Sequence, residues 1–173
     1  MGIECPAPLE AEHLVTDWAV DTTVLSNFAM VGRPDLLVAA SDGVVTACPA
    51  VLRELHAGEE QGRVPTCDWS AITMVGLTRE ESRLVSLYPA ALGAGEAESL
   101  AVAEKRGLVL LTDDAVARRM AKRRGVVVSG TIGVLRRLWE LDQLTADEAD
   151  DLYEEMKRRG FRGPPGSLRS FLQ

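Results

Sequence analysis

Three acidic residues directly follow apolar runs, at positions where a carboxylate can reach a shared crevice. Asp21 comes after "WAV", and Asp113 and Asp114 come after "LVLLT" at 108–112. The second run is apolar throughout, which is typical of a strand buried on both faces. In open α/β sheets, ligands bind beyond the carboxyl ends of the strands. We therefore expect these carboxylates to face one crevice.

Two further acids lie on the apolar stripes of expected helices. Glu96 shares a helical face with Leu100 and Ala103. Glu54 lies three residues after Val51. Such spacings place side chains on the buried face of a helix, where an acid is unusual. A site shared with the acids at the strand ends would explain both positions.

Carboxylates gathered in one crevice repel one another unless protons or cations neutralise them. A ligand set made only of oxygen atoms suits Mg²⁺ or Mn²⁺. Such an ion lowers the pKa of a bound water and stabilises the charge that develops on a phosphate during in-line attack. No histidine base is needed, which fits a chain with only 2 histidines.

Each acid also has a simpler interpretation when it is taken alone. Aspartate is a common N-cap, so Asp21, Asp113 and Asp114 could each simply begin a helix. Glu96 suits a first helical turn, where the helix dipole favours acids. Glu54 could lie on a solvated face. The metal-site hypothesis therefore depends on the whole set and not on any one member.

A basic cluster follows the last of these acids. By i,i+4 spacing, four of its members share one helical face: Arg118, Arg119, Lys122 and Arg123. This face could guide a phosphate backbone toward the acidic site. A solvated face is an equally good interpretation, because basic residues near a helix C-terminus gain from the dipole.

Composition limits the possible classes of function. The 173 residues suffice for one domain, and 46% apolar and 26% charged residues are ordinary for a globular protein. A net charge of −7 argues against a general nucleic-acid coat but not against a nuclease with a local basic footprint. No apolar run approaches the ~20 residues of a membrane span. Residues 1–13 contain no Lys or Arg and do not resemble a signal peptide, so we expect a cytoplasmic protein.

Several other kinds of site are disfavoured by the sequence. The cysteines Cys5, Cys48 and Cys67 form no CxxC pair, which argues against structural zinc and against a disulfide framework. Without HExxH or GxSxG, histidine-based metal sites and serine triads are poor candidates. The stretch "GAGEAE" lacks the third glycine of a dinucleotide-binding loop, so an NAD site is rejected.

Strand-like runs alternate with amphipathic stretches along the chain. The runs that predict strands are 13–20, 43–47, 71–77, 108–112 and 126–130. Helices are expected at 22–32, 34–41, 49–58, 78–88, 96–106, 115–124, 132–142 and 146–159. This alternation predicts right-handed βαβ units and a parallel sheet.

Local sequence patterns predict where several of these helices begin. Thr78 with Glu81, and Thr145 with Glu148, form capping-box patterns. Thr131 is expected to cap the helix that follows it.

Three stretches resemble the motifs of a known family, the PIN-domain nucleases, which include the VapC toxins of toxin–antitoxin pairs. "AVDTTVLSNF" (19–28) is similar to the first motif and "PAVLRELHAG" (49–58) to the second. "GEAESLAVAEKRGLVLLTDD" (95–114) is similar to the third and fourth motifs joined. The resemblance implies a three-layer α/β sandwich, with a central parallel sheet and helices on both faces.

The resemblance also implies roles for individual residues. The catalytic and metal-binding set would be Asp21, Glu54, Glu96 and Asp114, with Asp113 as a further metal candidate. Supporting roles would fall to Asn27 and Thr112. Because the toxins usually have Asp at the position of Glu96, the chain is more similar to a branch described only as predicted nucleic-acid-binding proteins.

The resemblance implies an endoribonuclease dependent on Mg²⁺ or Mn²⁺, of which the toxin of such a pair is one kind. Its partners would be RNA, an antitoxin protein and a second copy of the chain. A structure-specific DNA nuclease and a non-catalytic binding module are the alternatives. We divide the chain into an N-terminal extension (1–12), the nuclease domain (13–160) and a C-terminal tail with a short helix (161–173).

Overall fold

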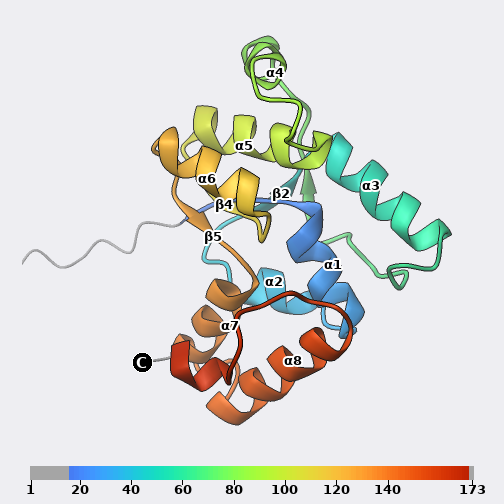
Figure 1. Ribbon diagram of the computed structural model, residues 1–173, viewed down its shortest axis with the longest axis vertical. Helices are drawn as coiled ribbons and strands as arrows, with labels where there is room; N and C mark the ends of the chain where they lie inside the picture. Colours follow the sequence, from blue (N-terminus) through green and yellow to red (C-terminus); the bar gives the residue numbers. More distant parts are fainter. Residues whose placement is uncertain (1–15, 172–173) are drawn as a thin grey trace, which may run out of the picture.

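The computed structural model describes residues 16–171, in which helices cover both faces of a five-stranded parallel sheet (Figure 1). The strands are β1 (Trp18–Val20), β2 (Val45–Ala47), β3 (Thr73–Met74), β4 (Val109–Leu111) and β5 (Val128–Ser129). Their order in the sheet is β3-β2-β1-β4-β5. The predicted sandwich around a parallel sheet is confirmed. The extension predicted for 1–12, and the beginning of the strand predicted at 13–20, lie outside the described residues.

The middle of the sheet is its most buried part, and the strand order reverses there. β1 pairs with β2 through Trp18 and Val45, and with β4 through Trp18 and Val109. A reversal of this kind opens a crevice at the carboxyl edge, next to β1. At the outer edge, the strand expected over 71–77 pairs only at Thr73–Met74, and both residues are exposed. β3 lies at the edge of the sheet and can pair only with the short strand β2. The observed strand is therefore shorter than the predicted run.

Eight helices of the described chain connect and cover the strands. They are α1 (Thr22–Met30), α2 (Asp35–Ala39), α3 (Pro49–Glu60), α4 (Arg79–Ser86), α5 (Ala94–Arg106), α6 (Ala115–Arg123), α7 (Thr131–Glu140) and α8 (Ala146–Arg158). A 3-10 turn, η1 (Leu168–Phe171), follows α8. No helix within residues 16–171 has the length and apolar content to cross a membrane.

The predicted helix starts are correct in two cases and wrong in one. Both capping boxes are present, one at the start of α4 and one at the start of α8. At α7, however, Gly130 is the N-cap, and Thr131 is the first helical residue. The Thr131 hydroxyl donates to Asp113 Oδ2 at 2.6 Å. The Thr131 side chain therefore points to Asp113, which follows β4, and does not cap the helix.

The segment that follows α8 is held in place by side chains of that helix. Tyr153 Oη donates to the carbonyl oxygen of Pro164 at 2.5 Å. Asp150 Oδ1 accepts hydrogen bonds from Ser167 Oγ at 2.7 Å and from Leu168 N at 2.6 Å. Residues 160–164, which we call the strap, therefore follow a fixed path past the ends of α7 and α8 (Figure 1).

Candidate active site

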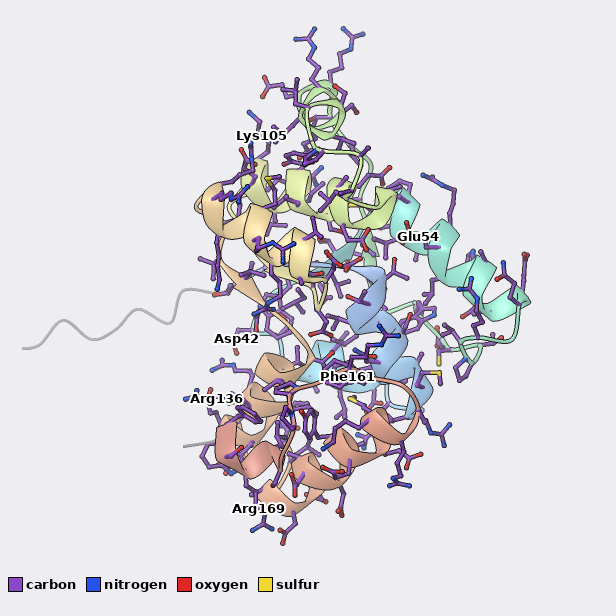
Figure 2. All side chains as sticks on the ribbon, in the orientation of Figure 1. Asp42, Glu54, Lys105, Arg136, Phe161 and Arg169 are labelled. Atoms are coloured by element: carbon purple, nitrogen blue, oxygen red, sulfur yellow. The ribbon has the colours of Figure 1, made fainter. Side chains whose placement is uncertain are left out.

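Three of the expected acids come together at the carboxyl edge of the sheet. Asp21 follows β1, Glu54 belongs to α3, and Glu96 lies in the first turn of α5. Each offers one carboxylate oxygen, and these oxygens all lie within 4.8 Å of one another. We call these three residues the acidic site. Figure 2 shows Glu54 where α3 meets the beginning of α5.

Glu54 is held by donors from two other elements. Thr22 Oγ1 donates to Glu54 Oε2 at 2.6 Å, and the Gly95 amide donates to Oε1 at 2.9 Å. A Cβ on Gly95 would lie 2.5 Å from Glu54 Oε2 and 3.0 Å from Thr22 Oγ1. Only glycine allows α5 to come this close to the carboxylate. Sequence reasoning missed both partners, although two glycines shortly before Glu96 were a signal of close approach.

Asp21 is the most buried member of the acidic site. Its Oδ2 accepts hydrogen bonds from Thr112 Oγ1 at 2.7 Å and from Thr23 Oγ1 at 2.8 Å. Its Oδ1 is buried and has no hydrogen-bond partner among the described residues. The pKa of Asp21 is raised to about 7, mainly by burial; the Thr112 hydroxyl lowers this pKa, and the charge of Glu96 raises it. Thr112 therefore supports the acidic site through Asp21.

The acids crowd one another electrostatically. Burial raises the pKa of Glu96, and the charges of Glu54 and Asp114 raise it further. Asp114 itself lies at the rim, outside the group of oxygens within 4.8 Å. It is the N-cap of α6, and its Oδ1 accepts from the Ala117 amide at 2.7 Å.

Asp113 points away from the acidic site, toward the start of α7. Its Oδ1 accepts from the Thr131 amide at 3.0 Å. Its Oδ2 accepts from Thr131 Oγ1 at 2.6 Å and from Asn27 Nδ2 at 3.0 Å. Asn27, expected to support the metal site, therefore contacts Asp113 and not the three gathered acids. Together the two residues connect α1, β4 and α7.

The basic cluster on α6 divides into two parts. Arg118 Nη1 donates to the carbonyl oxygens of Thr112 and Ser129, both at 2.9 Å, and so joins the ends of β4 and β5. The other three side chains are exposed, and within residues 16–171 none of them forms an ion pair: Arg119, Lys122 and Arg123. Arg118 therefore has a structural role, and three cations of the predicted basic face have no ion-pair partner among residues 16–171.

The acidic site has the chemistry of a site for a hard divalent cation. All its donors are carboxylate oxygens from three different elements. The buried Asp21 Oδ1 has no hydrogen bond from the described residues to compensate its burial, which is costly for a polar atom. A cation beside it would provide that compensation and would relieve the repulsion among the acids. These residues therefore fit Mg²⁺ or Mn²⁺.

Comparison with known families agrees with this geometry. A family model described as "PIN domain" matches residues 17–173. The match covers all three acids of the site, the basic helix α6 and the strap. No curated protein matches the chain significantly.

Proposed function

This chain belongs to the PIN-domain family, whose members are generally nucleases, and from that premise we propose that it is a divalent-metal-dependent endoribonuclease. The observation that carries the proposal is the convergence of Asp21, Glu54 and Glu96, where one buried oxygen of Asp21 has no hydrogen-bond partner in the described part of the chain. When bound there, Mg²⁺ or Mn²⁺ would supply positive charge to activate a water and to stabilise the phosphate under attack.

In this proposal the five acids have three different tasks. Asp21, Glu54 and Glu96 hold the ion, and Thr22 and Gly95 fix the orientation of Glu54. Asp114, at the rim, adds negative charge beside Glu96 and completes the catalytic set. Asp113, whose oxygens already accept three hydrogen bonds, is better suited to holding α7 than to binding metal.

The exposed cations of α6 suit the docking of a nucleic-acid backbone. Arg119, Lys122 and Arg123 lie on the helix that begins directly after Asp114. Lys and Arg on such a helix can neutralise phosphates and release counterions. By family resemblance alone, the proposal extends to a toxin with an antitoxin partner, to a homodimer and to a cytoplasmic location.

The decisive experiment compares the wild-type protein with Asp21→Asn on single-stranded RNA in Mn²⁺. Asparagine keeps the shape of the side chain but removes the charge that faces the ion. We expect cleavage to fall by about a thousandfold, which corresponds to roughly 4 kcal/mol of lost transition-state stabilisation. RNA binding and the fold should persist. The matched control is Asp151→Asn, which changes an exposed acid of α8 and should cut like the wild type.

Three outcomes would contradict the proposal. Equal cleavage by Asp21→Asn and the wild type would remove the acidic site from the chemistry. Cleavage confined to branched or single-stranded DNA would favour the DNA nuclease. Binding without cleavage of any RNA or DNA would favour a non-catalytic module.

A further inference from the structure

A groove of about 620 Å³ opens directly beside the acidic site, between segments that are far apart in the sequence. One wall contains Thr22, Thr23 and Asp114, and the other contains residues 160–162 of the strap. The two threonines are the residues whose hydroxyls hold the acids of the site. The groove therefore offers a path along the surface to a strand whose phosphate reaches those acids.

A second groove, of about 430 Å³, adjoins the first. The two share Asp113, Phe161 and Arg162 as lining residues. Phe161 and Arg162 therefore lie where a chain running from one groove into the other must pass. Figure 2 shows Phe161 in the strap, between α1 and α8.

The strap presents these two side chains on a rigid support. The Phe161 amide donates to the carbonyl oxygen of Met156 at 2.9 Å. The Phe161 ring packs edge-on against Tyr153, with 6.0 Å between the ring centroids. Gly163 has no room for a side chain, because a Cβ would lie 2.6 Å from Tyr153 Oη and 2.8 Å from Phe161 Cε1. The position of Phe161 is therefore fixed before any ligand arrives.

Arg162 is the only cation that lines the first groove among the described residues, and the other charged residues there are Asp113 and Asp114. It is exposed and forms no ion pair within residues 16–171. A polyanion that enters an acidic groove needs a compensating charge, and a guanidinium binds phosphate in a bidentate manner. Arg162 can supply this compensating positive charge in the groove.

We propose that Arg162 binds a backbone phosphate of the RNA strand next to the bond that is cut, while Phe161 forms the apolar wall for the adjoining base. The proposal rests on the proposed nuclease function and names the residues that position its substrate. Only an unpaired base can lie against an aromatic side chain. The substrate is therefore single-stranded at this point.

The test compares Arg162→Ala and Arg162→Lys with the wild type on a short fluorescein-labelled single-stranded RNA. For Arg162→Ala, we expect Kd and KM to rise at least about tenfold, because a charge-assisted contact to phosphate is lost, while kcat stays near the wild-type value. The slope of log K against log salt should become shallower by about 0.7, the contribution of one phosphate on a single strand. Arg162→Lys keeps the charge and should keep the slope.

The matched control is Arg83→Ala on α4, which lies at the far end of the molecule from α8 (Figure 1). Arg83 is also exposed and without an ion pair in the described chain, so this variant should bind RNA like the wild type. Unchanged melting temperatures for both alanine variants would exclude misfolding as the cause of a binding defect.

The outcomes separate this inference from the nuclease proposal. If the wild type binds RNA but cuts nothing with any divalent ion, the nuclease function fails, and the binding comparison still decides the role of Arg162. If Arg162→Ala keeps the wild-type Kd, KM and salt slope, the inference is wrong even though the protein is a nuclease. If the wild type does not bind single-stranded RNA at all, both proposals are overturned.

Discussion

Asp21 and Glu81 are both almost completely buried, with 0% and 1% of their surface exposed, yet their surroundings are opposite. The Glu81 carboxylate accepts from Arg106 Nε at 2.7 Å, from Arg106 Nη2 at 2.9 Å and from the Thr78 amide at 2.7 Å. The Arg106 guanidinium lowers the pKa of Glu81 to about 2. Burial raises the pKa of Asp21 to about 7.

The difference lies in which charges accompany each carboxylate. Glu81 has a cation of the protein beside it and joins α4 to α5 through Arg106. Asp21 has two threonine hydroxyls, acidic neighbours and one oxygen with no partner among the described residues. The first arrangement stabilises the folded chain by itself. The second costs stability until a cation from solution is bound, which is a feature of functional sites.

The two carboxylates should differ most in how the stability of the protein changes when each is replaced by its uncharged amide. In metal-free buffer at pH 8, Asp21→Asn should stabilise the protein by up to about 4 kcal/mol, the equivalent of a pKa raised from 3.8 to about 7. Between these two pH values the folded state holds a proton that the unfolded state has released. The stability of the wild type therefore falls as pH rises from about 4 to about 7.

Urea denaturation of the wild type and of Asp21→Asn from pH 4 to pH 8 would measure this difference in stability. The gain should be absent near pH 4 and complete above pH 7, because the wild-type carboxyl is protonated at the lower end and ionised at the upper end. A destabilised Asp21→Asn at pH 8 would show that the charge of Asp21 is already compensated without metal.

Adding Mn²⁺ should change the stability by a smaller amount, but it should affect proteins with and without the Asp21 charge differently. A ligand that binds only the folded state at a hundredfold excess over its Kd adds about 2.7 kcal/mol, which is roughly 5–10 °C in Tm for a chain of this size. The wild type and Glu81→Gln should both gain this stability, whereas Asp21→Asn should not. Differential scanning fluorimetry with a chelator control would detect it, and an equal gain in all three proteins would place the ion elsewhere.

The smallest expected effect is the loss of the Glu81–Arg106 pair. Glu81→Gln should cost about 2 kcal/mol near neutral pH, because it weakens hydrogen bonds to a charged group, and cleavage should stay unchanged. Since the folded pKa of Glu81 is about 2 against 4.5 unfolded, this contribution is present above pH 4.5 and is lost as pH falls toward 2. Acid titration of Tm measures the effect, and a loss of cleavage at unchanged stability would contradict the assignment.

Local sequence patterns predicted one feature of Glu81 and missed another. The capping box of Thr78 and Glu81 was visible because its two members are three residues apart. The pair with Arg106, 25 residues away, depends on how α4 packs on α5 and leaves no local signal. The same limit applies to Arg118, whose spacing predicts an exposed cation but whose guanidinium binds the ends of two strands.

The acidic site was more accessible to sequence reasoning because its residues occupy strand ends and helix stripes. Those positions predicted that Asp21, Glu54 and Glu96 would approach one another, as they do. They could not distinguish Asp113 from Asp114, since adjacent residues at a strand end differ only in side-chain direction. Asp113 is held in its direction by Thr131 and by Asn27, which lie 18 and 86 residues from it in the chain.

The central place of β1 in the sheet also has a consequence during synthesis. Asp21, Glu54 and Glu96 all leave the ribosome before β4, but β1 needs Val109–Leu111 as its second neighbour, and Asp21 needs the hydroxyl of Thr112. Pairing between segments this distant in sequence forms slowly, because a long loop must first close. A nascent chain that ends before Thr112 carries every acid of the site without the scaffold that gathers them, so the complete site appears only late in translation.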